Sequence, residues 1–281
     1  MKVAVTGAGG FIGQHVLPAL RATGADVVAV MRPGSTLQAG AQGIEVVQLD
    51  LAGAGADAFS RIGRPDSMIH LAWGGLPHYQ SSHHLDRELP LQQAFLETCV
   101  RSGLRHLVVT GTCFEYGLQS GELHENLPAQ PNTVYGKAKD EVRRSLQRLQ
   151  SQFDFGLSWL RIFYLYGPGQ AATSLYSLLR AAVANGDASF DMSPGDQIRD
   201  FLPVEEAGRG IAQAARRGRN DGITNLCSGK PARVVDIVRE WLREWDAAIE
   251  LKTGVFPYPD YEPFAFWGDR RKLDGLSGDA P

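Results

Sequence analysis

Residues 1–13 read Met-Lys-Val-Ala-Val-Thr-Gly-Ala-Gly-Gly-Phe-Ile-Gly, and this stretch decides the fold. The apolar run before the first glycine predicts a short buried parallel strand, and 11–21 predicts a helix. Gly7 permits a tight turn, Gly10 lets a pyrophosphate approach the backbone, and Gly13 lets the helix pack against the strand. A helix N-terminus offers unpaired N–H groups and a positive dipole end. The stretch therefore predicts dinucleotide binding, although glycines alone would also fit an ordinary strand-to-helix turn.

The composition excludes several classes of protein. The 281 residues are 43% hydrophobic and 21% charged, as is typical of a globular chain that forms one large α/β domain, or a large and a small one. A net charge of −3 offers no electrostatic footprint for nucleic acid or an anionic membrane. No apolar run reaches the ~20 residues of a membrane span, and no signal peptide precedes the first strand. We therefore expect a cytoplasmic protein that binds neither nucleic acid nor membrane.

The cysteine and histidine residues indicate no disulfide or metal framework. The cysteines are Cys99, Cys113 and Cys227. They cannot all pair, and none shows Cys-x-x-Cys spacing, so we predict neither a disulfide scaffold nor a zinc site. No acid or cysteine completes a ligand set around His78, His83 and His84, so we expect a mobile loop without a metal. We expect His70, at a strand end, to be packed and hydrogen-bonded rather than catalytic.

The strand predicted at 26–30 indicates which dinucleotide binds. An NAD-preferring site usually places an acid at the end of this strand for the ribose 2′-hydroxyl. Here Met31 holds that place, with Arg32 beside it. An acid would repel a 2′-phosphate, whereas a guanidinium can pair with it through two hydrogen bonds. The sequence therefore favours NADP, and NAD stays open because Arg32 could be a solvated loop charge.

Two further strand ends predict the rest of the cofactor site. A strand over 44–49 ends at Asp50 and Leu51, where a carboxylate could meet the adenine amino group. A strand over 67–72 is followed by Trp73. The end of this strand is rich in small and turn-forming residues, and a dinucleotide would cross the sheet edge there. We expect both strand ends to contact the cofactor.

Strands and helices alternate further along the chain. An amphipathic helix is predicted over 85–102, a strand over 104–110 and a helix from 134 to about 150. Apolar strands that alternate with helices are typical of a parallel sheet covered on both faces. The sequence therefore predicts an α/β fold with a doubly wound parallel sheet.

The last of these helices carries a tyrosine and a lysine in a spacing suited to chemistry. Tyr135 and Lys139 are four residues apart and lie on one helical face, whereas Lys137 points away. An ammonium near a phenol can lower the pKa of the phenol and hold a nicotinamide ribose. Such a tyrosine can give a proton to a carbonyl or take one from an alcohol. In isolation, the same spacing is compatible with an ordinary surface helix.

Together these motifs resemble the extended short-chain dehydrogenase/reductase family, which contains nucleotide-sugar epimerases, dehydratases and ketoreductases. The resemblance covers essentially the whole chain and includes Thr112. Three later segments match as well: 160–169, 197–201 and 225–231. It implies a Rossmann fold with a small, discontinuous C-terminal substrate domain. The implied domains are 1–163 plus 199–223 for NAD(P) binding and 164–198 plus 224–281 for the substrate.

The resemblance also implies roles for single residues. Thr112 would bind the sugar oxygen, Tyr135 would be the acid/base, and Lys139 would orient the ribose and tune the tyrosine. Arg199 would hold the diphosphate of the substrate, unless it forms a structural pair with Asp200.

A homodimer is expected from the same resemblance. Relatives pair their two corresponding helices across a two-fold axis as a four-helix bundle. In this chain the helices over 85–102 and 135–150 carry apolar residues on more than one face. These residues are Leu89, Phe95, Leu96, Val142, Leu146 and Leu149.

Departures from the family pattern narrow the set of reactions that we expect this chain to catalyse. Related 4,6-dehydratases carry an Asp-Glu pair after the threonine, where this chain has Cys113 and Phe114. Glu115 is adjacent but need not face the same way. Tyr164 stands where a substrate-facing asparagine is common, and 256–269 lacks a second diphosphate arginine. The nucleotide end of the pocket is therefore unusual.

The remaining catalytic set suits hydride transfer to a ketone, or oxidation and re-reduction in 4-epimerisation. The sequence favours NADPH-dependent reduction of the C4 keto group of a nucleotide-linked 4-keto-6-deoxyhexose. A nucleotide-sugar 4-epimerase with tightly bound NAD(P) is the first alternative, and a catalytically idle NADP-binding regulator is the second. The predicted catalytic residues are Thr112, Tyr135 and Lys139. The predicted cofactor-binding residues are Gly7, Gly10, Phe11, Ile12, Gly13, Arg32, Asp50, Leu51, Leu71, Ala72, Trp73, Tyr135 and Lys139, and the predicted substrate-binding residues are Thr112, Cys113, Phe114, Tyr164 and Arg199.

Overall fold

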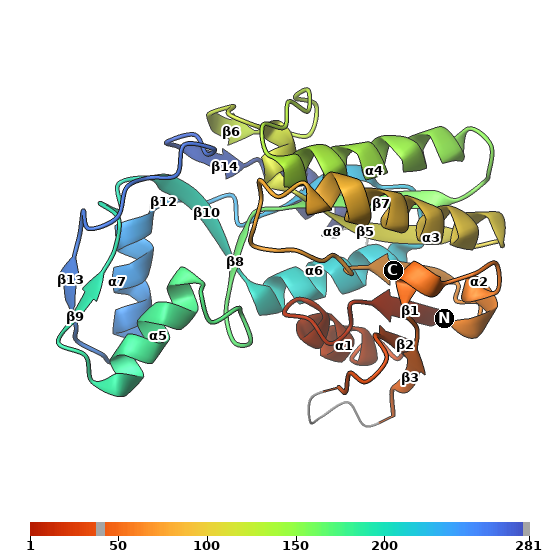
Figure 1. Cartoon of the computed structure of the whole chain (residues 1–281), viewed down its shortest axis with the longest axis horizontal. Coiled ribbons are helices and arrows are strands. Elements are labelled where there is room, and N and C mark those ends of the chain that lie inside the picture. The colour runs from red at the N-terminus through yellow and green to blue at the C-terminus, as the bar shows by residue number, and fades with distance from the viewer. Residues whose placement is uncertain (38–42, 278–281) are drawn as a thin grey trace.

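The computed structural model describes residues 1–37 and 43–277. Residues 38–42 and 278–281, which the predicted domain ranges include, lie outside the described residues. A seven-stranded parallel sheet, the main sheet, has the strand order β11-β7-β5-β4-β1-β2-β3 (Figure 1). Its strands are β1 (Lys2–Thr6), β2 (Asp26–Met31), β3 (Glu45–Gln48), β4 (Ser67–His70), β5 (His106–Thr112), β7 (Gly156–Ile162) and β11 (Gly222–Leu226). The predicted doubly wound parallel sheet is confirmed.

Helices cover both faces of the main sheet because the side chains of each strand alternate between two apolar cores. Val3 and Val5 pack into the first core, and Ala4 and Val28 pack into the second. A strand buried on both faces reads as a continuous apolar run, as β1 does. The first face carries α1 (Gly13–Arg21), α6 (Val204–Arg217) and α8 (Arg271–Ser277), and the second carries α2 (Ala58–Arg61), α3 (Leu89–Arg101) and α4 (Val134–Gln150).

A smaller group of elements, the C-terminal lobe, follows from the carboxyl end of β7 and lies on the left of Figure 1. It contains β8 (Tyr164–Tyr166), α5 (Leu175–Asn185), β9 (Ser189–Asp191), β10 (Ile198–Pro203), β12 (Pro231–Arg233), α7 (Val234–Glu244), β13 (Glu250–Lys252) and β14 (Phe266–Gly268). The lobe has a core of its own around Leu179, Met192, Val238 and Trp241. β10 pairs with β8 and β12, β13 pairs with β9, and β14 pairs with β6 (Gly121–Leu123).

The chain leaves this lobe after β10, returns to it at β12, and leaves it again after β14 to form α8. Although β10 belongs to the small three-stranded sheet, α6 packs on the main sheet and β11 is its edge strand. The division into two domains stays a prediction. Within residues 1–37 and 43–277, no helix combines the length and the apolar character needed to cross a membrane.

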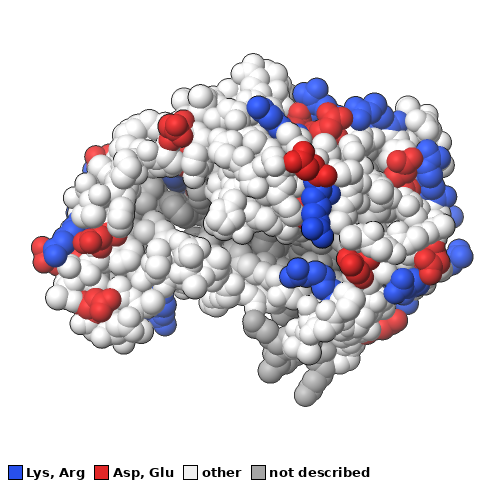
Figure 2. Space-filling view, viewed as in Figure 1, with Lys and Arg blue, Asp and Glu red and all other residues white. Residues whose placement is uncertain are grey.

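The winding of the main sheet reverses between β1 and β4. β1 pairs with β2 on one side and with β4 on the other. In open parallel sheets, ligands bind outside the carboxyl ends of the strands at such a point. The surface of the molecule is hollowed between the C-terminal lobe and the rest of the chain (Figure 2). The topology therefore directs attention to the loops after β1, β4 and β5.

Candidate active site

The loop between β1 and α1 fits a dinucleotide phosphate. Gly7 has a φ of 68°, which favours glycine, and a Cβ on it would lie 2.8 Å from the amide nitrogen of Ala72. A Cβ on Gly13 would lie 2.5 Å from the carbonyl oxygen of Gly7. Just before α1, the amides of Phe11 and Ile12 donate no hydrogen bond to any described residue. Unpaired amide groups at the start of a helix, beside glycines that lack a Cβ, can donate hydrogen bonds to a pyrophosphate.

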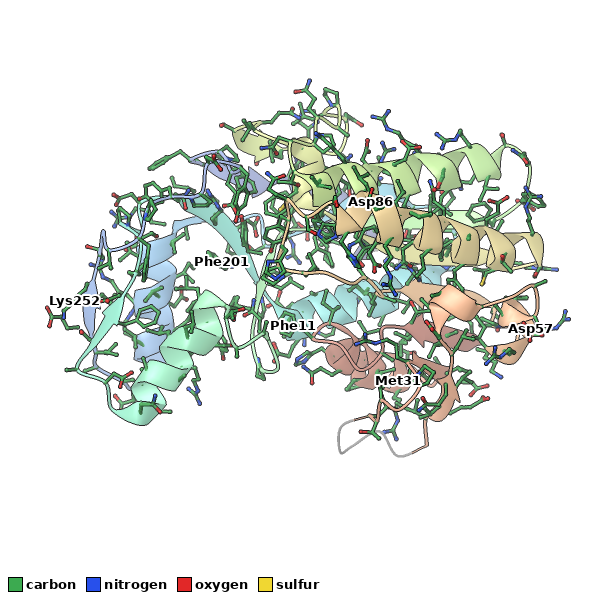
Figure 3. The ribbon with its side chains drawn as sticks, in the orientation of Figure 1. Phe11, Met31, Asp57, Asp86, Phe201 and Lys252 are labelled. Atoms are coloured by element: carbon green, nitrogen blue, oxygen red, sulfur yellow. The ribbon has the colours of Figure 1, made fainter. Side chains whose placement is uncertain are left out.

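The end of β2 places an arginine at the same edge of the sheet. Met31 is buried, and Figure 3 shows it near α1, as it does Phe11. Arg32 is exposed, and its guanidinium forms no hydrogen bond or ion pair with another described residue. Its charge is therefore available to an anion from solution.

The ends of β3 and β4 complete this edge. Asp50 is exposed after β3, and its carboxylate accepts a hydrogen bond from the amide of Ala52 at 3.1 Å. Leu51 packs beside it against the core under α2 and α3. Leu71 donates its amide hydrogen to the last carbonyl of β1, and Ala72 faces the first glycine of the loop. Of these predicted cofactor residues, Leu71 and Ala72 lie against the loop before α1.

A threonine fixes the start of α4 and thereby the place of Tyr135. The hydroxyl of Thr133 caps the helix and accepts a hydrogen bond from the amide of Gly136 at 3.0 Å. The amide of Tyr135 donates to the carbonyl of Tyr79 at 2.9 Å. The Tyr135 side chain is buried, and its hydroxyl forms no hydrogen bond within the described residues. The phenol is therefore held in place by backbone bonds and left free to meet a ligand.

Lys139 lies one turn further along α4, among aromatic rings. Its ammonium donates a hydrogen bond to the carbonyl oxygen of Thr110 at 2.9 Å. The ammonium nitrogen is 4.1 Å from the centroid of the Trp73 ring and 5.8 Å from that of the Tyr135 ring. The predicted pairing of lysine and tyrosine on one helical face is therefore present.

Burial governs the protonation of this pair. The sequence predicts that Lys139 lowers the pKa of Tyr135, but burial, the largest cause of the shift, raises that pKa well above its ordinary value. Burial also lowers the pKa of Lys139 to about 7, although the carboxylates of Glu115 and Glu88 raise it. Tyr135 therefore stays protonated at neutral pH, in the form that can donate a proton.

Thr112 ends β5 and begins the short helical turn η3 (Cys113–Tyr116) with a reciprocal cap. Its hydroxyl accepts a hydrogen bond from the amide of Phe114 at 3.3 Å, and its own amide donates to the carboxylate of Glu115 at 2.9 Å. The spacing Thr-x-x-Glu is a sequence signature of such a cap. The role of Glu115 was thus readable from the sequence but was missed there.

Glu115 is fully buried and joins two strands of the main sheet to α4. Its carboxylate accepts a hydrogen bond from the indole nitrogen of Trp159 at 2.9 Å and one from Nε of Arg161 at 2.8 Å, both on β7. Arg143 of α4 lies 3.9 Å from the same carboxylate and donates to Asp140 at 2.6 Å. The carboxylate is therefore held by structural partners.

The predicted substrate residues Cys113, Phe114 and Tyr164 lie in one apolar cluster with Tyr135. Burial raises the pKa of the Cys113 thiol, which keeps it neutral. The hydroxyl of Tyr164 is buried and finds no hydrogen-bond partner among the described residues, and burial with the nearby Glu262 carboxylate raises its pKa. Cys113, Phe114 and Tyr164 therefore bring no charge of their own to this side of the site.

Arg199 on β10 is buried, and all three nitrogens of its guanidinium donate hydrogen bonds within the chain. Its Nε and Nη2 donate to one carboxylate oxygen of Glu262, at 3.2 and 2.7 Å, and its Nη1 donates to the carbonyls of Ile198 and Phe264. Asp200 instead accepts hydrogen bonds from backbone amides. The structural pair with Asp200 that the sequence left open is therefore not formed, because Glu262, 63 positions along the chain, takes that place.

Two loop tyrosines that sequence reasoning missed pack beside the candidate proton donor. The ring of Tyr79 lies 5.7 Å from that of Tyr135 and 4.9 Å from that of Phe114. Tyr261 lies 6.0 Å from Tyr79, and the side chain of Asn132 donates to its carbonyl at 2.9 Å. Single aromatic residues in loops carry no periodic signal, so the sequence offered no means of finding them.

The histidine loop is attached at two points. The indole nitrogen of Trp73 donates to Nδ1 of His84 at 3.1 Å, and Nε2 of His83 lies 3.2 Å from the carboxylate of Glu88. These two histidines therefore have hydrogen-bond partners, and the mobility of the loop stays a prediction. His70 is buried and hydrogen-bonded as predicted, and burial lowers its pKa to about 3.

Comparison with known proteins agrees with this geometry. Residues 3–227 match the model of the NAD dependent epimerase/dehydratase family. The dTDP-6-deoxy-L-talose 4-dehydrogenase (NAD(+)) of Aggregatibacter actinomycetemcomitans is 28% identical over 95% of this chain and 99% of its own length. The UDP-glucose 4-epimerase of Azospirillum brasilense is 26% identical over 85% of this chain and 76% of its own. A solved structure described as MoeE5 in complex with UDP-glucuronic acid and NAD has a TM-score of 0.83 at 25% identity, covering 99% of this chain and 93% of that one.

Replacing Glu115 by glutamine tests the buried network. Glu115→Gln keeps the shape of the side chain but leaves the buried Arg161 guanidinium without a carboxylate. We expect the free energy of unfolding, measured by urea denaturation, to fall by about 3 kcal/mol. The matched control is Glu97→Gln, which removes an exposed pair with Arg101 and should cost less than about 1 kcal/mol. Equal losses in the two variants would contradict the structural role of Glu115.

Proposed function

The chain belongs to the NAD dependent epimerase/dehydratase family, and within it we propose that the protein is a 4-ketoreductase. It uses NADPH to reduce the C4 keto group of a nucleotide-linked 4-keto-6-deoxyhexose. The observation that carries the proposal is the commitment of Glu115, the one acid of η3, to Trp159 and Arg161. Dehydration needs a base that removes a proton from a sugar carbon, and η3 has none to offer. Hydride transfer needs only Thr112 and the tyrosine–lysine pair.

Tyr135 is the proton donor in this mechanism. Its buried phenol is protonated at neutral pH and can give its proton to the C4 oxygen as negative charge develops there. The ammonium of Lys139 stabilises the phenolate that remains and holds the nicotinamide ribose. The hydroxyl of Thr112 donates a hydrogen bond to the same sugar oxygen. The dinucleotide supplies the hydride to C4, so the ketone gains one hydride and one proton.

The relatives support chemistry at C4 and keep one alternative open. The 4-dehydrogenase relative is named for a dTDP-6-deoxyhexose, which matches the proposed substrate class. The UDP-glucose 4-epimerase relative favours the first alternative, a 4-epimerase that retains its NAD(P). A catalytically idle NADP-binding regulator is the second alternative. The presence of Thr112, Tyr135 and Lys139 together weighs against a regulator.

Arg199 is the proposed partner of the substrate diphosphate, and this role requires an exchange. The guanidinium gives two hydrogen bonds to Glu262, so an incoming phosphate oxygen has to replace that carboxylate. The chain around Tyr261 is tied to Asn132 by one side-chain hydrogen bond, and to Tyr79 by ring packing. Substrate binding therefore involves movement of this segment.

Arg32 sets the proposed cofactor preference. Because its guanidinium has no partner among the described residues, it can pair with the 2′-phosphate of NADPH. We expect NADPH to bind at least ~10-fold more tightly than NADH, which corresponds to about 1.4 kcal/mol, in a fluorescence titration. Arg32→Ala should narrow the gap without loss of fold. Equal affinities for NADPH and NADH in the unaltered protein would rule out this role of Arg32. The titration matters because the 4-dehydrogenase relative is named for NAD(+).

A homodimer through α3 and α4 stays a prediction with less support than the sequence suggested. Phe95, Leu96, Val142, Leu146 and Leu149 are buried in the chain's own core, so they are not available to a partner. The two helices lie side by side on one face of the molecule (Figure 1), where a second copy could pack. Sedimentation at micromolar concentration should give the mass of a dimer, and a monomer mass would refute it.

Cofactor consumption tests the reductase proposal. With NADPH and a nucleotide-linked 4-keto-6-deoxyhexose, the enzyme should consume about one NADPH per sugar, followed at 340 nm. Tyr135→Phe should lower the rate by ~10²–10⁴-fold, the usual effect of a positioned proton donor, and leave NADPH binding nearly unchanged. Interconversion of a saturated nucleotide-sugar at C4 without added cofactor would instead establish the epimerase.

A further inference from the structure

Trp73 contacts the lysine of the candidate active site through the face of its ring. The ammonium nitrogen of Lys139 lies 4.1 Å from the centroid of that ring. A cation over the face of an indole is attracted by the ring quadrupole, and the attraction is stronger where water is excluded. Lys139 is 3% exposed, so the contact is largely desolvated. The rings of Trp73 and Tyr135 also pack in a T-shaped arrangement, with 5.8 Å between ring centroids.

A histidine holds the indole in this position. The indole nitrogen of Trp73 donates a hydrogen bond to Nδ1 of His84 at 3.1 Å, and Nε2 of His84 donates to the carbonyl of His78 at 3.0 Å. This pair of bonds requires the neutral tautomer with its proton on Nε2. Burial lowers the pKa of His84, which favours that neutral form. His84 lies in η2 (His84–Glu88), a π-helical turn at the start of α3, and such turns are frequent at functional sites.

Among the described residues, no carboxylate contacts the ammonium of Lys139. Glu115 and Glu88 both favour its charged form, whereas burial opposes it. Glu115 is held by β7, and Glu88 accepts a hydrogen bond from Gln92 and lies against His83. The nearby imidazoles of His70 and His84 have pKa values lowered by burial and are neutral at pH 7. Within residues 1–37 and 43–277, the ammonium is in direct contact with the carbonyl oxygen of Thr110 and the face of Trp73.

We propose that Trp73 is a positioning residue for the reaction: its indole face, fixed by His84, holds the ammonium of Lys139 beside Tyr135 and stabilises its charge. The neutral ring can do this without forming an ion pair, which would compete with a cofactor for the ammonium. The catalytic value of this contact rests on the proposed function, whereas the contact itself does not.

Titration of Lys139 by NMR tests the contact without substrate or cofactor. The chain has six lysines, namely Lys2, Lys137, Lys139, Lys230, Lys252 and Lys272. Labelling lysine with ¹³C at Cε gives few signals, and Lys139→Met identifies the one that titrates near neutral pH. In Trp73→Leu the pKa of Lys139 should fall by about one unit relative to the unaltered protein. Trp73→Phe retains a smaller aromatic face and should give an intermediate shift.

The matched control is Trp245→Leu, the same substitution in the C-terminal lobe, where Trp245 lies under Arg180. It should leave the pKa of Lys139 unchanged. If the Lys139 pKa is the same in the unaltered protein, Trp73→Leu and Trp73→Phe, the proposal is wrong. Circular dichroism confirms that each variant is folded before titration, and Trp73→Phe keeps the test usable should the leucine variant unfold.

The pH profile of keto-sugar reduction provides the second measurement. Because the charged lysine is the active form, the rate should fall as pH rises through the pKa of Lys139, and this fall should occur about one pH unit lower in Trp73→Leu. A uniform loss of rate at every pH would indicate a merely structural tryptophan and contradict the proposal. A shifted lysine pKa in a protein that reduces no keto-sugar would refute the proposed function and leave the role of Trp73 intact.

Discussion

The burial of the Glu115 carboxylate is the interaction on which the site depends. A buried carboxylate is stable only when hydrogen bonds and cations replace its water. Here the amide of Thr112 and the nitrogens of Trp159 and Arg161 do so, and they come from β5 and β7. With Arg143 of α4 close by, the end of β5 and the flank of α4 are held in a fixed relation. The buried carboxylate of Glu115 therefore helps to fix the positions of both the Thr112 hydroxyl and the Tyr135 phenol.

The same burial sets the chemistry of the site. Exclusion of water raises the pKa of Tyr135 and lowers that of Lys139 to about 7, so one group keeps its proton and the other is poised to lose it. Neighbouring Cys113 and Phe114 add no charge, and Glu115 is committed elsewhere. A site of this kind can move a hydride and one proton at a sugar oxygen. It lacks, within η3, the base that elimination of water would require.

The sequence predicted the features that depend on local periodicity. The glycine spacing after β1, the apolar runs of the strands and the four-residue spacing of Tyr135 and Lys139 all have short-range physical causes, and the fold they implied is the one observed. The contacts missed are those between distant segments. Glu262 binds Arg199 across 63 positions, and no pattern within either segment marks the pair. The same holds for two other contacts: Trp73 donates a hydrogen bond to a histidine of the loop, and most of the apolar residues of α3 and α4 pack in the chain's own core.

Isotope transfer tests the central claim, reduction at C4, most directly. NADPH that carries deuterium at both C4 positions of the nicotinamide would be incubated with the enzyme and a nucleotide-linked 4-keto-6-deoxyhexose. The product would be analysed by NMR and mass spectrometry. A reductase places one deuterium on C4 of every sugar formed, with one NADP⁺ released for each. Recovery of the 4-keto-6-deoxyhexose without deuterium at C4, and with the added NADPH unchanged, would contradict this account.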